Sequence, residues 1–356
     1  GLGDVYKRQI YISLQKDGIL FKMRRTQDLP DKESATMFFQ DCKLARQAQI
    51  TGISHSIKEI LPPDLLDLTQ LQKEANIRYG YTASEVYDIA QSLYEKKLIS
   101  YPRTSSRYLT EDVFDSLSPI MARLLSWELF PAAKGTGGID ISSLSRHVIS
   151  AEKANVHHAI IITGIRPGNL SEKEMQVYRL VAGRMLEVFM APCRIETTNV
   201  EAVCAAQHFK AEQTRIIEAG WHDVFMHSDM VPKSGYSVNE LPEVKKGDNL
   251  NVCGCNMVHK KELPVDPFTD AELVEYMELN GLGTVSSRTN IIRTLVNRKY
   301  IRYSGKYIVP TPKGIFTYET IRGKKIADTS LTADWEKQLA GLESGMITGQ
   351  DFLNRI

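Results

Sequence analysis

The sequence predicts a multi-domain α+β protein in which two β-rich segments enclose a helical middle, and a second helical segment follows them. Near the start of the chain, and again between residues 194 and 258, apolar and polar side chains alternate as they do in strands. Elsewhere apolar side chains recur every three or four residues, as they do in helices. The 356 residues are enough for two or three domains, and 42% apolar with 24% charged residues is typical of a globular protein.

The first β-rich segment begins at residue 10. Residues 1–9 carry no recognisable pattern, and we interpret them as a leader foreign to the domain. Alternation over residues 10–23 predicts two strands joined by a hairpin turn at Asp17-Gly18. A helix is expected over residues 32–42 and a further strand over residues 53–60.

The helical middle, residues 61–192, contains two capping-box patterns, Thr-x-x-Gln at 69–72 and Thr-x-x-Glu at 82–85. Gly80 is placed to end the first of these helices in a left-handed cap. The second helix leads toward Tyr101. Because proline disfavours the α region for the residue before it, Pro102 predicts that the helix stops before Tyr101 and that the phenol lies on a loop.

The tripeptide Tyr101-Pro-Arg103 combines a possible nucleophile with a possible phosphate ligand. A phenolate can attack phosphorus, and a guanidinium two residues away can bind two oxygens of the same phosphate and stabilise the transition state. A tyrosine–phosphate ester would keep the energy of the broken phosphodiester, so the strand could be resealed without ATP. On these three residues alone, a packed tyrosine and a solvated arginine remain open.

Two other patterns in the helical middle have competing interpretations. The glycine-rich run at 134–138 could cradle a phosphate, but it lacks the Gly-Lys-Ser/Thr of a P-loop and is better interpreted as a linker. His157 and His158 are adjacent, so on an extended segment they point to opposite faces and do not easily share a metal ion. A phosphate-facing His157 is the better functional hypothesis, and a packed histidine is the structural one. Residues 171–190 predict a long helix.

The second β-rich segment, residues 193–262, is expected to form one discontinuous domain with residues 10–60. Five cysteines suggest no disulfide framework, and a reducing cytoplasm fits. Cys253-x-Cys255 is the only close pair, and no second pair completes a zinc site, so no metal site is predicted. No apolar run reaches the roughly 18 residues of a membrane span, and no signal-peptide pattern opens the chain.

The last segment, residues 263–356, predicts a capped helix after Thr269, a break at Gly281-x-Gly283, another helix, a hairpin at 300–309 and a final helix at 331–342. Helix, turn, helix and β wing is the order found in winged-helix DNA-binding proteins. The net charge is only +1, yet ten Lys and Arg accompany a single acid, Glu319, between residues 283 and 325. Such a block can bind a polyanion locally, or it can be a solvated helix face.

Four stretches, in this order, resemble type IA DNA topoisomerases, and bacterial topoisomerase III most of all. The stretch around the tyrosine reads Leu-Ile-Ser-Tyr-Pro-Arg-Thr-Ser-Ser-Arg-Tyr-Leu at 98–109. The others are Pro-Pro-Asp-Leu-Leu-Asp-Leu at 62–68 with Leu-Gln-Lys-Glu-Ala-Asn at 71–76, His-His-Ala-Ile-Ile at 157–161, and Gly-Leu-Gly-Thr at 281–284 with Leu-Thr-Ala-Asp-Trp-Glu at 331–336. The likeness covers roughly residues 10–356.

The resemblance implies a β-rich arch split by an inserted helical domain, followed by an incomplete winged-helix-like domain that binds single-stranded DNA. It implies cleavage of one strand through a 5′-phosphotyrosine, strand passage and religation. The catalytic residues that it implies are Tyr101, Arg103 and His157. DNA contacts are expected at Gln91, Arg107, Thr284, Arg288 and Arg293.

In this family Mg²⁺ is held by an acidic toprim domain with an Asp-x-Asp motif, which is absent from this sequence. The chain is therefore expected to be a fragment, inactive or weak alone. We also expect a monomer in the bacterial cytoplasm, associated with the nucleoid, without membrane contact, with helicase or recombination proteins as possible partners. The alternative is a winged-helix DNA-binding protein without catalysis. The residue patterns of tyrosine recombinases and of relaxases are not present.

Overall fold

The computed structural model describes residues 6–27, 29, 31–127, 129–130, 144–154, 157–226, 241–261 and 267–353. The chain forms two compact units. The barrel unit comprises residues 1–61, 192–220 and 233–266. The helical unit comprises residues 62–191, 221–232 and 267–356. The predicted tyrosine-bearing segment and the predicted winged-helix-like segment thus lie in one compact unit.

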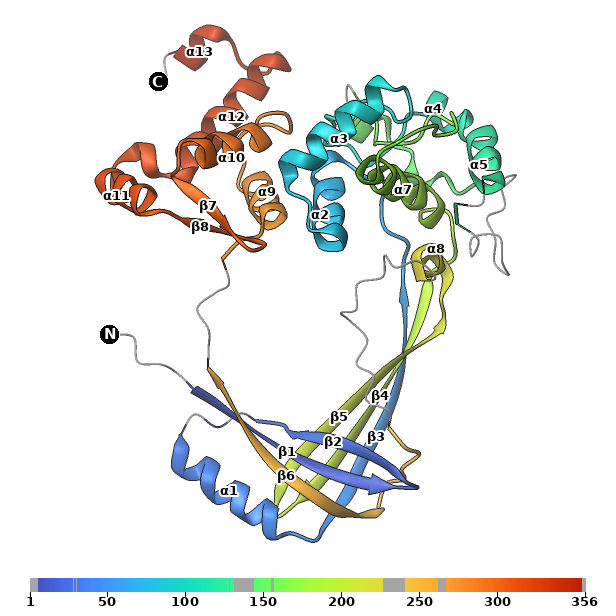
Figure 1. The fold of residues 1–356 in the computed structure, drawn as a ribbon, viewed down its shortest axis with the longest axis vertical. Coiled ribbons are helices and arrows are strands. Elements are labelled where there is room, and N and C mark those ends of the chain that lie inside the picture. Colours follow the sequence, from blue (N-terminus) through green and yellow to red (C-terminus); the bar gives the residue numbers. More distant parts are fainter. Residues whose placement is uncertain are drawn as a thin grey trace. The chain divides into compact units, whose positions relative to one another are not determined.

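The barrel unit is a closed antiparallel barrel with the strand order β1-β2-β5-β4-β3-β6 (Figure 1). Its elements are β1 (Tyr6–Lys16), β2 (Ile19–Arg25), α1 (Lys32–Leu44), β3 (Gln47–Ile60), β4 (Cys193–Cys204), β5 (Gln207–Glu218) and β6 (Asn249–Lys261). Ile10, Ile12 and Leu14 of β1 are fully buried, as the alternation in the sequence predicts. The expected hairpin is confirmed, with Asp17 and Gly18 both at positive φ in its turn.

The interpretation of residues 1–9 as a leader foreign to the domain was wrong for residues 6–9. These residues form the start of β1 and pair with β6, from Tyr6 opposite Lys261 to Gln9 opposite Val258. Paired strands share their main-chain hydrogen bonds with a neighbour, so this stretch is part of the barrel. Residues 1–5 lie outside the described residues.

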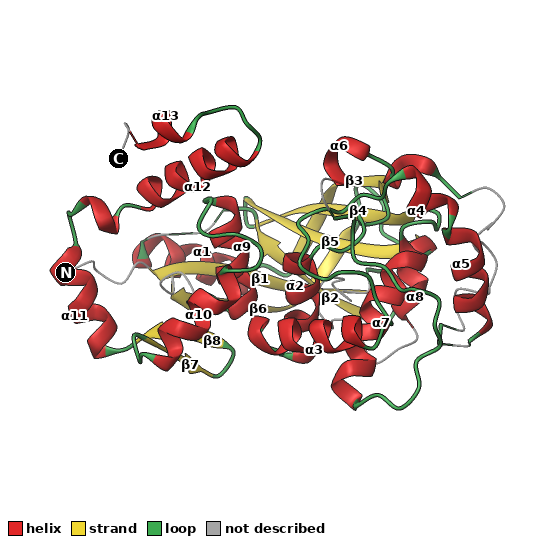
Figure 2. Cartoon of the chain, turned by 90° about the horizontal axis from the view of Figure 1, so that it is seen from above, coloured by secondary structure: helices red, strands yellow, loops and turns green. Residues whose placement is uncertain are grey.

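The helical unit contains both helical segments of the chain; Figure 2 shows all helices in red. Its first part holds α2 (Leu68–Tyr79), α3 (Ala83–Glu95), α4 (Glu111–Asp115), α5 (Leu117–Ser126), α6 (Ala151–Ala154), α7 (Glu172–Glu187) and α8 (Asp223–Met226). Its second part holds α9 (Asp270–Leu279), α10 (Arg288–Asn297), β7 (Ile301–Ser304), β8 (Tyr307–Pro310), α11 (Pro312–Ile321), α12 (Thr329–Glu343) and α13 (Gly349–Leu353). The glycine-rich run at 134–138 lies outside the described residues.

One of the two capping-box predictions was wrong. The cap of α2 is Asp67, whose carboxylate accepts a hydrogen bond from the Gln70 N–H at 2.7 Å. Gln72 does not turn back to Thr69; its side-chain amide donates instead to the Ala83 carbonyl at 2.9 Å. The end of this helix is as predicted, because Gly80 adopts φ +71°.

Polar contacts made by Gln72, Asp88 and the start of α3 hold α2 and α3 against α9 and α10 in the second part of the helical unit. We call these contacts together the α3–α10 ties. Gln72 donates to the Thr289 hydroxyl of α10 at 3.0 Å. Arg293 of α10 forms an ion pair with Asp88 of α3 at 2.8 Å. The carboxylate of Asp270, at the start of α9, accepts hydrogen bonds from the main chain at the start of α3 and from the β7 hairpin. These ties join segments about 200 residues apart within one compact unit. Within the described part of the chain, no helix is long and apolar enough to cross a membrane.

Candidate active site

The helix that leads to Tyr101 begins and ends through local contacts. At its start the Thr82 hydroxyl accepts a hydrogen bond from the Glu85 N–H at 3.2 Å, and the Glu85 carboxylate accepts one from the Thr82 N–H at 2.9 Å. After its end, Lys97 adopts φ +59°, a left-handed conformation that is uncommon for a residue with a side chain. Leu98 then turns into the core at 4% exposure. The chain therefore changes direction just before Tyr101, as Pro102 in the sequence predicts.

Main-chain contacts hold the Tyr101 loop beside residues 157–163. The Ser100 N–H donates to the Ile161 carbonyl at 2.8 Å, and the Ile161 N–H donates back to the Ser100 hydroxyl at 3.0 Å. The same hydroxyl donates to the Ala159 carbonyl at 3.2 Å. Because these bonds involve backbone groups, they fix where the tyrosine stands relative to the histidine-containing segment.

Tyr101 and His157, both predicted as catalytic, are in contact. Their ring centroids are 4.5 Å apart at an interplanar angle of 43°. The Tyr94 ring stands edge-on to the Tyr101 ring, with centroids 5.5 Å apart. The His157 side chain is exposed, and its carbonyl accepts a hydrogen bond from the Thr104 hydroxyl. Among the described residues, none forms a hydrogen bond with the Tyr101 hydroxyl, which leaves the phenol oxygen open to a ligand.

Arg103 is held by neutral groups. Its Nη2 donates to the Gln91 side-chain carbonyl at 3.2 Å, and its guanidinium carbon lies 5.2 Å from the centroid of the Tyr87 ring. The Gln91 amide nitrogen donates to Glu95 at 2.8 Å, which orients the carbonyl oxygen toward Arg103. The Nε of Arg103 is buried without a hydrogen-bond partner among the described atoms. A positioned cation that no described carboxylate neutralises is suited to bind an anion.

A groove of about 580 Å³ runs beside Arg103 within the helical unit. Tyr87 and Arg103 line one part of it. The other part is formed by the start and one side of α10, through Ser286, Ser287, Asn290, Ile291, Thr294 and Leu295. The Ile291 side chain is 38% exposed and contributes an apolar group to this groove. The groove thus joins an unneutralised guanidinium to hydroxyl, amide and apolar groups.

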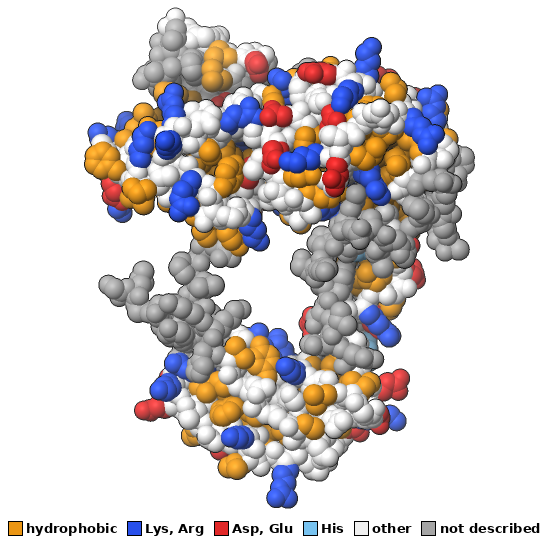
Figure 3. All heavy atoms as spheres, in the orientation of Figure 1, with side chains coloured by type: hydrophobic (Ala, Val, Ile, Leu, Met, Phe, Trp, Pro, Cys, Tyr) orange, Lys and Arg blue, Asp and Glu red, His pale blue; other side chains and the backbone are white. Residues whose placement is uncertain are grey.

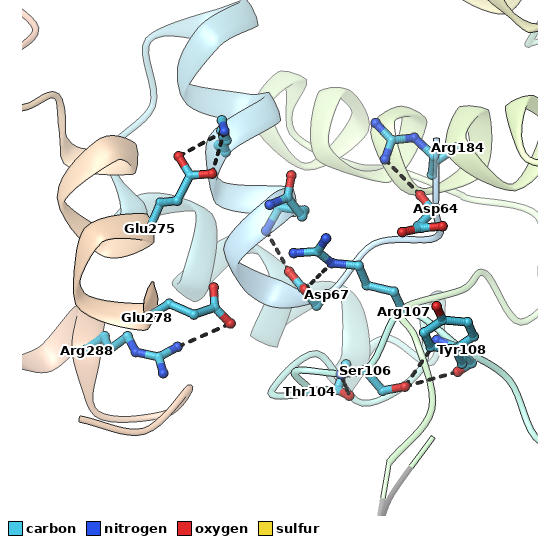
Figure 4. Close-up of polar contacts among 12 residues, drawn as sticks. Asp64, Asp67, Thr104, Ser106, Arg107, Tyr108, Arg184, Glu275, Glu278 and Arg288 are labelled. Atoms are coloured by element: carbon cyan, nitrogen blue, oxygen red, sulfur yellow. Dashed lines mark hydrogen bonds and ion pairs between the residues drawn. The ribbon is translucent and has the colours of Figure 1, made fainter. Parts of the chain in front are cut away.

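Arg107, a predicted DNA contact, is engaged within the protein (Figure 4). Its Nε donates to Asp67 at 2.6 Å, and the Asp67 side chain is only 2% exposed. Burial raises the pKa of Asp67, while the Gln70 N–H and Arg107 oppose that rise. The Arg107 side chain nevertheless remains 36% exposed.

The predicted DNA contacts on the second part of the unit differ in exposure. Thr284 is exposed, and its N–H donates to the Ser287 hydroxyl at 2.8 Å, which closes the turn before α10. Arg293 is bound to α3 through the ties described above. Arg288 is buried at 8% exposure, with its Nη1 3.7 Å from Glu278 and its Nε donating to the Leu282 carbonyl (Figure 4). Burial lowers the pKa of Arg288. The structure therefore assigns Arg288 an internal contact that the sequence did not predict.

The two adjacent histidines do not act together. The His158 ring faces the carbonyl of the next residue, with Nδ1 2.7 Å from the Ala159 oxygen, whereas the His157 ring contacts Tyr101. Within the described ranges, no group of three His, Cys, Asp or Glu side chains is placed to hold a metal ion. The residues described here thus do not fit a magnesium site.

Sequence analysis missed two aromatic residues of the site, Tyr87 and Tyr94. Both belong to α3, and they lie four residues before and three residues after Gln91. Residues three and four apart share a helix face, so this spacing was a usable signal for side chains around Gln91. The contribution of α10 carried no such signal, because it depends on contacts between distant segments.

The basic block of the sequence lies over the second part of the helical unit. In Figure 3, the face over α10, α11 and the β7–β8 hairpin carries mainly Lys, Arg and hydrophobic side chains. Acidic side chains on this face are mixed with basic ones nearer α2 and α3. Positive charge is therefore concentrated on the part of the unit that contributes α10 to the groove.

The comparisons with known proteins agree on one family. A sequence model described as DNA topoisomerase matches residues 6–354. DNA topoisomerase 3 of Bacillus licheniformis is 31% identical over 335 residues, covering 87% of this chain and 46% of that protein. DNA topoisomerase 1 of Methanocaldococcus jannaschii is 30% identical over 327 residues, covering 91% of this chain and 41% of that protein. The chain spans about half the length of the curated relatives it matches.

A solved structure shares the fold. Full-length topoisomerase I from Thermotoga maritima superposes with a TM-score of 0.76 at 23% sequence identity, covering 99% of this chain and 58% of that one. The mixed α and β architecture with a closed sheet, predicted as α+β from the sequence, is thereby confirmed. With the family match over residues 6–354, the chain belongs to the type IA DNA topoisomerases.

Proposed function

We propose that this chain supplies the strand-cleaving part of an ATP-independent type IA DNA topoisomerase. The Tyr101 oxygen attacks a backbone phosphorus of single-stranded DNA, the bond to the 3′ oxygen breaks, and that oxygen takes up a proton. The 5′ phosphoryl group stays on the tyrosine while another strand passes through the gap, and the reverse reaction reseals the break. One phosphate ester replaces another, so resealing needs no ATP.

The observation that carries this proposal is the environment of the Arg103 guanidinium. It lies two residues from Tyr101, lines a groove, and is held by Gln91 and Tyr87 without a neutralising carboxylate among the described residues. A preorganised cation of this kind stabilises the charge that develops on phosphate oxygens in the transition state. A structural arginine would instead be expected in an ion pair or in bulk solvent.

We assign His157 to the same phosphate. Its ring contacts the Tyr101 ring and is exposed, so its free edge can reach a group bound to the tyrosine. An imidazole can donate a hydrogen bond to a phosphate oxygen or a proton to the departing 3′ oxygen. This role rests on the ring contact and the exposure, and Thr104 supports it by holding the His157 carbonyl.

We propose that residues 61–192 form the tyrosine-bearing domain and residues 263–356 a winged-helix-like domain that binds single-stranded DNA, with residues 10–60 and 193–262 as the arch. Gln91 orients Arg103, and Thr284 is exposed in the turn before α10, where a phosphate can approach the start of that helix. Arg107 adds charge near the DNA, and Arg288 and Arg293 hold α10 in place.

The cofactor proposed for the whole enzyme is Mg²⁺, held by the acidic toprim domain of the family. The described residues of this chain do not fit a metal, and no step above passes through one. We further propose a monomer that acts in the bacterial cytoplasm, associated with the nucleoid, alongside helicase or recombination proteins. These proposals rest on the bacterial DNA topoisomerases among the relatives.

Covalent trapping tests the proposal. The chain is joined to a toprim domain of this family, mixed with Mg²⁺ and end-labelled single-stranded DNA, and stopped with detergent. We expect a 5′-linked protein–DNA adduct that is absent in Tyr101→Phe, with unchanged DNA affinity. Tyr94→Phe is the matched control and should retain the adduct, since Tyr94 contacts Tyr101 only through its ring edge. DNA binding without an adduct in the unmodified protein would favour the non-catalytic winged-helix alternative.

A further inference from the structure

The face of α10 that lines the groove beside Arg103 is neutral. Its residues lie three or four positions apart, so they project from one side of the helix. They are Ser287, Asn290, Ile291 and Thr294. Of the described residues that line the groove, Arg103 alone carries a charge. A groove with one cation and a neutral wall is suited to a nucleotide, whose phosphate is charged and whose base is not.

The hydroxyl groups of this wall are already engaged within the protein. The Ser287 hydroxyl accepts a hydrogen bond from the Thr284 N–H at 2.8 Å, and the Ser286 and Thr284 hydroxyls lie 3.1 Å apart. The Thr294 hydroxyl donates to the main-chain carbonyl of Asn290, one turn earlier, at 2.7 Å. These hydroxyls thus stabilise the turn before α10 and the helix itself.

The Asn290 side chain differs from the hydroxyls because it is available to a ligand. It is exposed, and its amide forms no hydrogen bond with another described residue. An amide offers N–H donors beside a carbonyl acceptor. Adenine presents a donor and an acceptor side by side, at N6 and N7, and asparagine pairs with both in protein–DNA complexes. Asn290 is therefore equipped to recognise the edge of a base.

Apolar surface for the flat face of a base lies next to Asn290. Ile291 is 38% exposed, and Leu295, one turn later, is partly buried in the same wall. On the opposite wall, the guanidinium carbon of Arg103 lies 5.2 Å from the centroid of the Tyr87 ring. The volume of about 580 Å³ is typical of sites for small molecules, so the groove has room for one nucleotide.

We propose that the groove takes one unpaired adenine of the bound strand, and that Asn290 selects this base by pairing with its N6 and N7 atoms. The inference rests on the proposed function, because it takes single-stranded DNA as the ligand. Phosphate contacts carry no sequence information, so Asn290 adds a base preference to a contact that Arg103 makes with any strand. Cut sites should then have adenine at one fixed distance from the cleaved bond.

Binding by the full chain tests this inference without DNA cleavage. Fluorescence anisotropy gives the Kd for oligo-dA and for oligo-dT of the same length, in which every register places the same base in the groove. We expect the preference for oligo-dA over oligo-dT to fall by about 5- to 150-fold in Asn290→Ala, because one bidentate contact gives discrimination of this size. Comparing the ratio of the two Kd values between proteins removes the effect of stacking within oligo-dA.

Asn297→Ala is the matched control. Asn297 is an exposed amide of the same helix, but it does not line the groove. This variant should keep the ratio of the unmodified chain. The same ratio in Asn290→Ala as in the unmodified chain would overturn the inference, and so would an equal loss of preference in Asn297→Ala.

Mapping of cut sites distinguishes a failure of this inference from a failure of the proposed function. In the chain joined to a toprim domain, with Mg²⁺ and random-sequence single strands, adenine should be enriched at one position, and Asn290→Ala should remove that enrichment. Adducts without such an enrichment would overturn the inference and leave the proposed function in place. An adenine preference in binding that depends on Asn290, without any adduct, would support the inference while the proposed cleavage fails.

Discussion

Replacing Arg103 by alanine should slow DNA cleavage strongly while changing the stability of the protein only slightly. In the unliganded protein, the hydrogen bond to Gln91 and the contact with the Tyr87 ring favour the folded state. These are worth about 1.5–3 and about 0.5–1 kcal/mol in ordinary cases. The buried Nε without a described partner costs about 1–3 kcal/mol. The contributions largely cancel, so we expect Arg103→Ala to change the free energy of unfolding by about 1 kcal/mol or less.

The effect on cleavage should be much larger. Removing one preorganised donor from a developing oxyanion costs about 2.7–4 kcal/mol, which is a factor of about 10²–10³ in rate. Arg103→Lys keeps the charge but loses the planar fork, so we expect a smaller loss. The assay is single-turnover formation of the covalent adduct in the chain joined to a toprim domain, with single-stranded DNA affinity and urea unfolding measured on the same samples.

The matched control is Arg302→Ala, which removes an exposed arginine from β7 in the same unit. It should leave adduct formation within about twofold of the unmodified rate, because Arg302 is exposed and does not line the groove beside Arg103. Cleavage by Arg103→Ala at the unmodified rate would refute the phosphate role. So would a loss of unfolding free energy as large as the rise in the barrier, since Arg103 would then be structural.

Three further predictions follow from the helical unit and its ligand. Gly183→Ala should lower the free energy of unfolding by about 1–3 kcal/mol in urea, because a Cβ there would overlap the Phe225 ring, whereas Gly168→Ala, with open space around it, should have little effect. Burial raises the pKa of Glu187 to about 7 despite Arg184, so the folded state keeps a proton that the unfolded chain releases near pH 4.5. Its contribution to stability should therefore fall as the pH rises from about 4.5 to 7, and Glu187→Gln should remove that slope in urea unfolding; a slope that persists would contradict the assignment. Affinity for single-stranded DNA should fall as salt rises, because phosphate contacts release counterions, and a salt-independent Kd in a filter-binding titration would point to base stacking instead.

Most elements could be predicted from the sequence because their signals are local. Strand alternation, the Asp17-Gly18 turn and the capping pair at 82–85 each depend on residues within a few positions of one another. The cap of α2 was misassigned because Thr69 also carries a suitable hydroxyl, whereas the observed cap is Asp67, which accepts from the Gln70 N–H and also pairs with Arg107, forty residues later. Asp67 and Thr69 are both acceptable caps by residue type, so residue type alone left the choice open.

The residues of the candidate site likewise fall into those with a local signal in the sequence and those that depend on tertiary contacts. Tyr101, Arg103 and Gln91 were predicted from one continuous stretch, in which α3 ends at Glu95, seven residues before Pro102, and the resemblance is dense. The far wall of the groove could not be predicted in this way, since it depends on how α10 packs against α3. Arg288 illustrates the limit: its place in a basic block suggested a surface charge, but packing against Glu278 buries it.

The α3–α10 ties should fix the length of single-stranded DNA that the helical unit covers on one side of the cut. They fasten α10 to the helix that precedes the tyrosine, so the two walls of the groove cannot slide past each other without breaking the Gln72–Thr289 and Arg293–Asp88 contacts. Under the proposed function, the number of nucleotides between the cut and the edge of the protected strand would be the same for different DNA sequences. A variant that breaks one of the ties should make this number variable while Tyr101 remains the nucleophile.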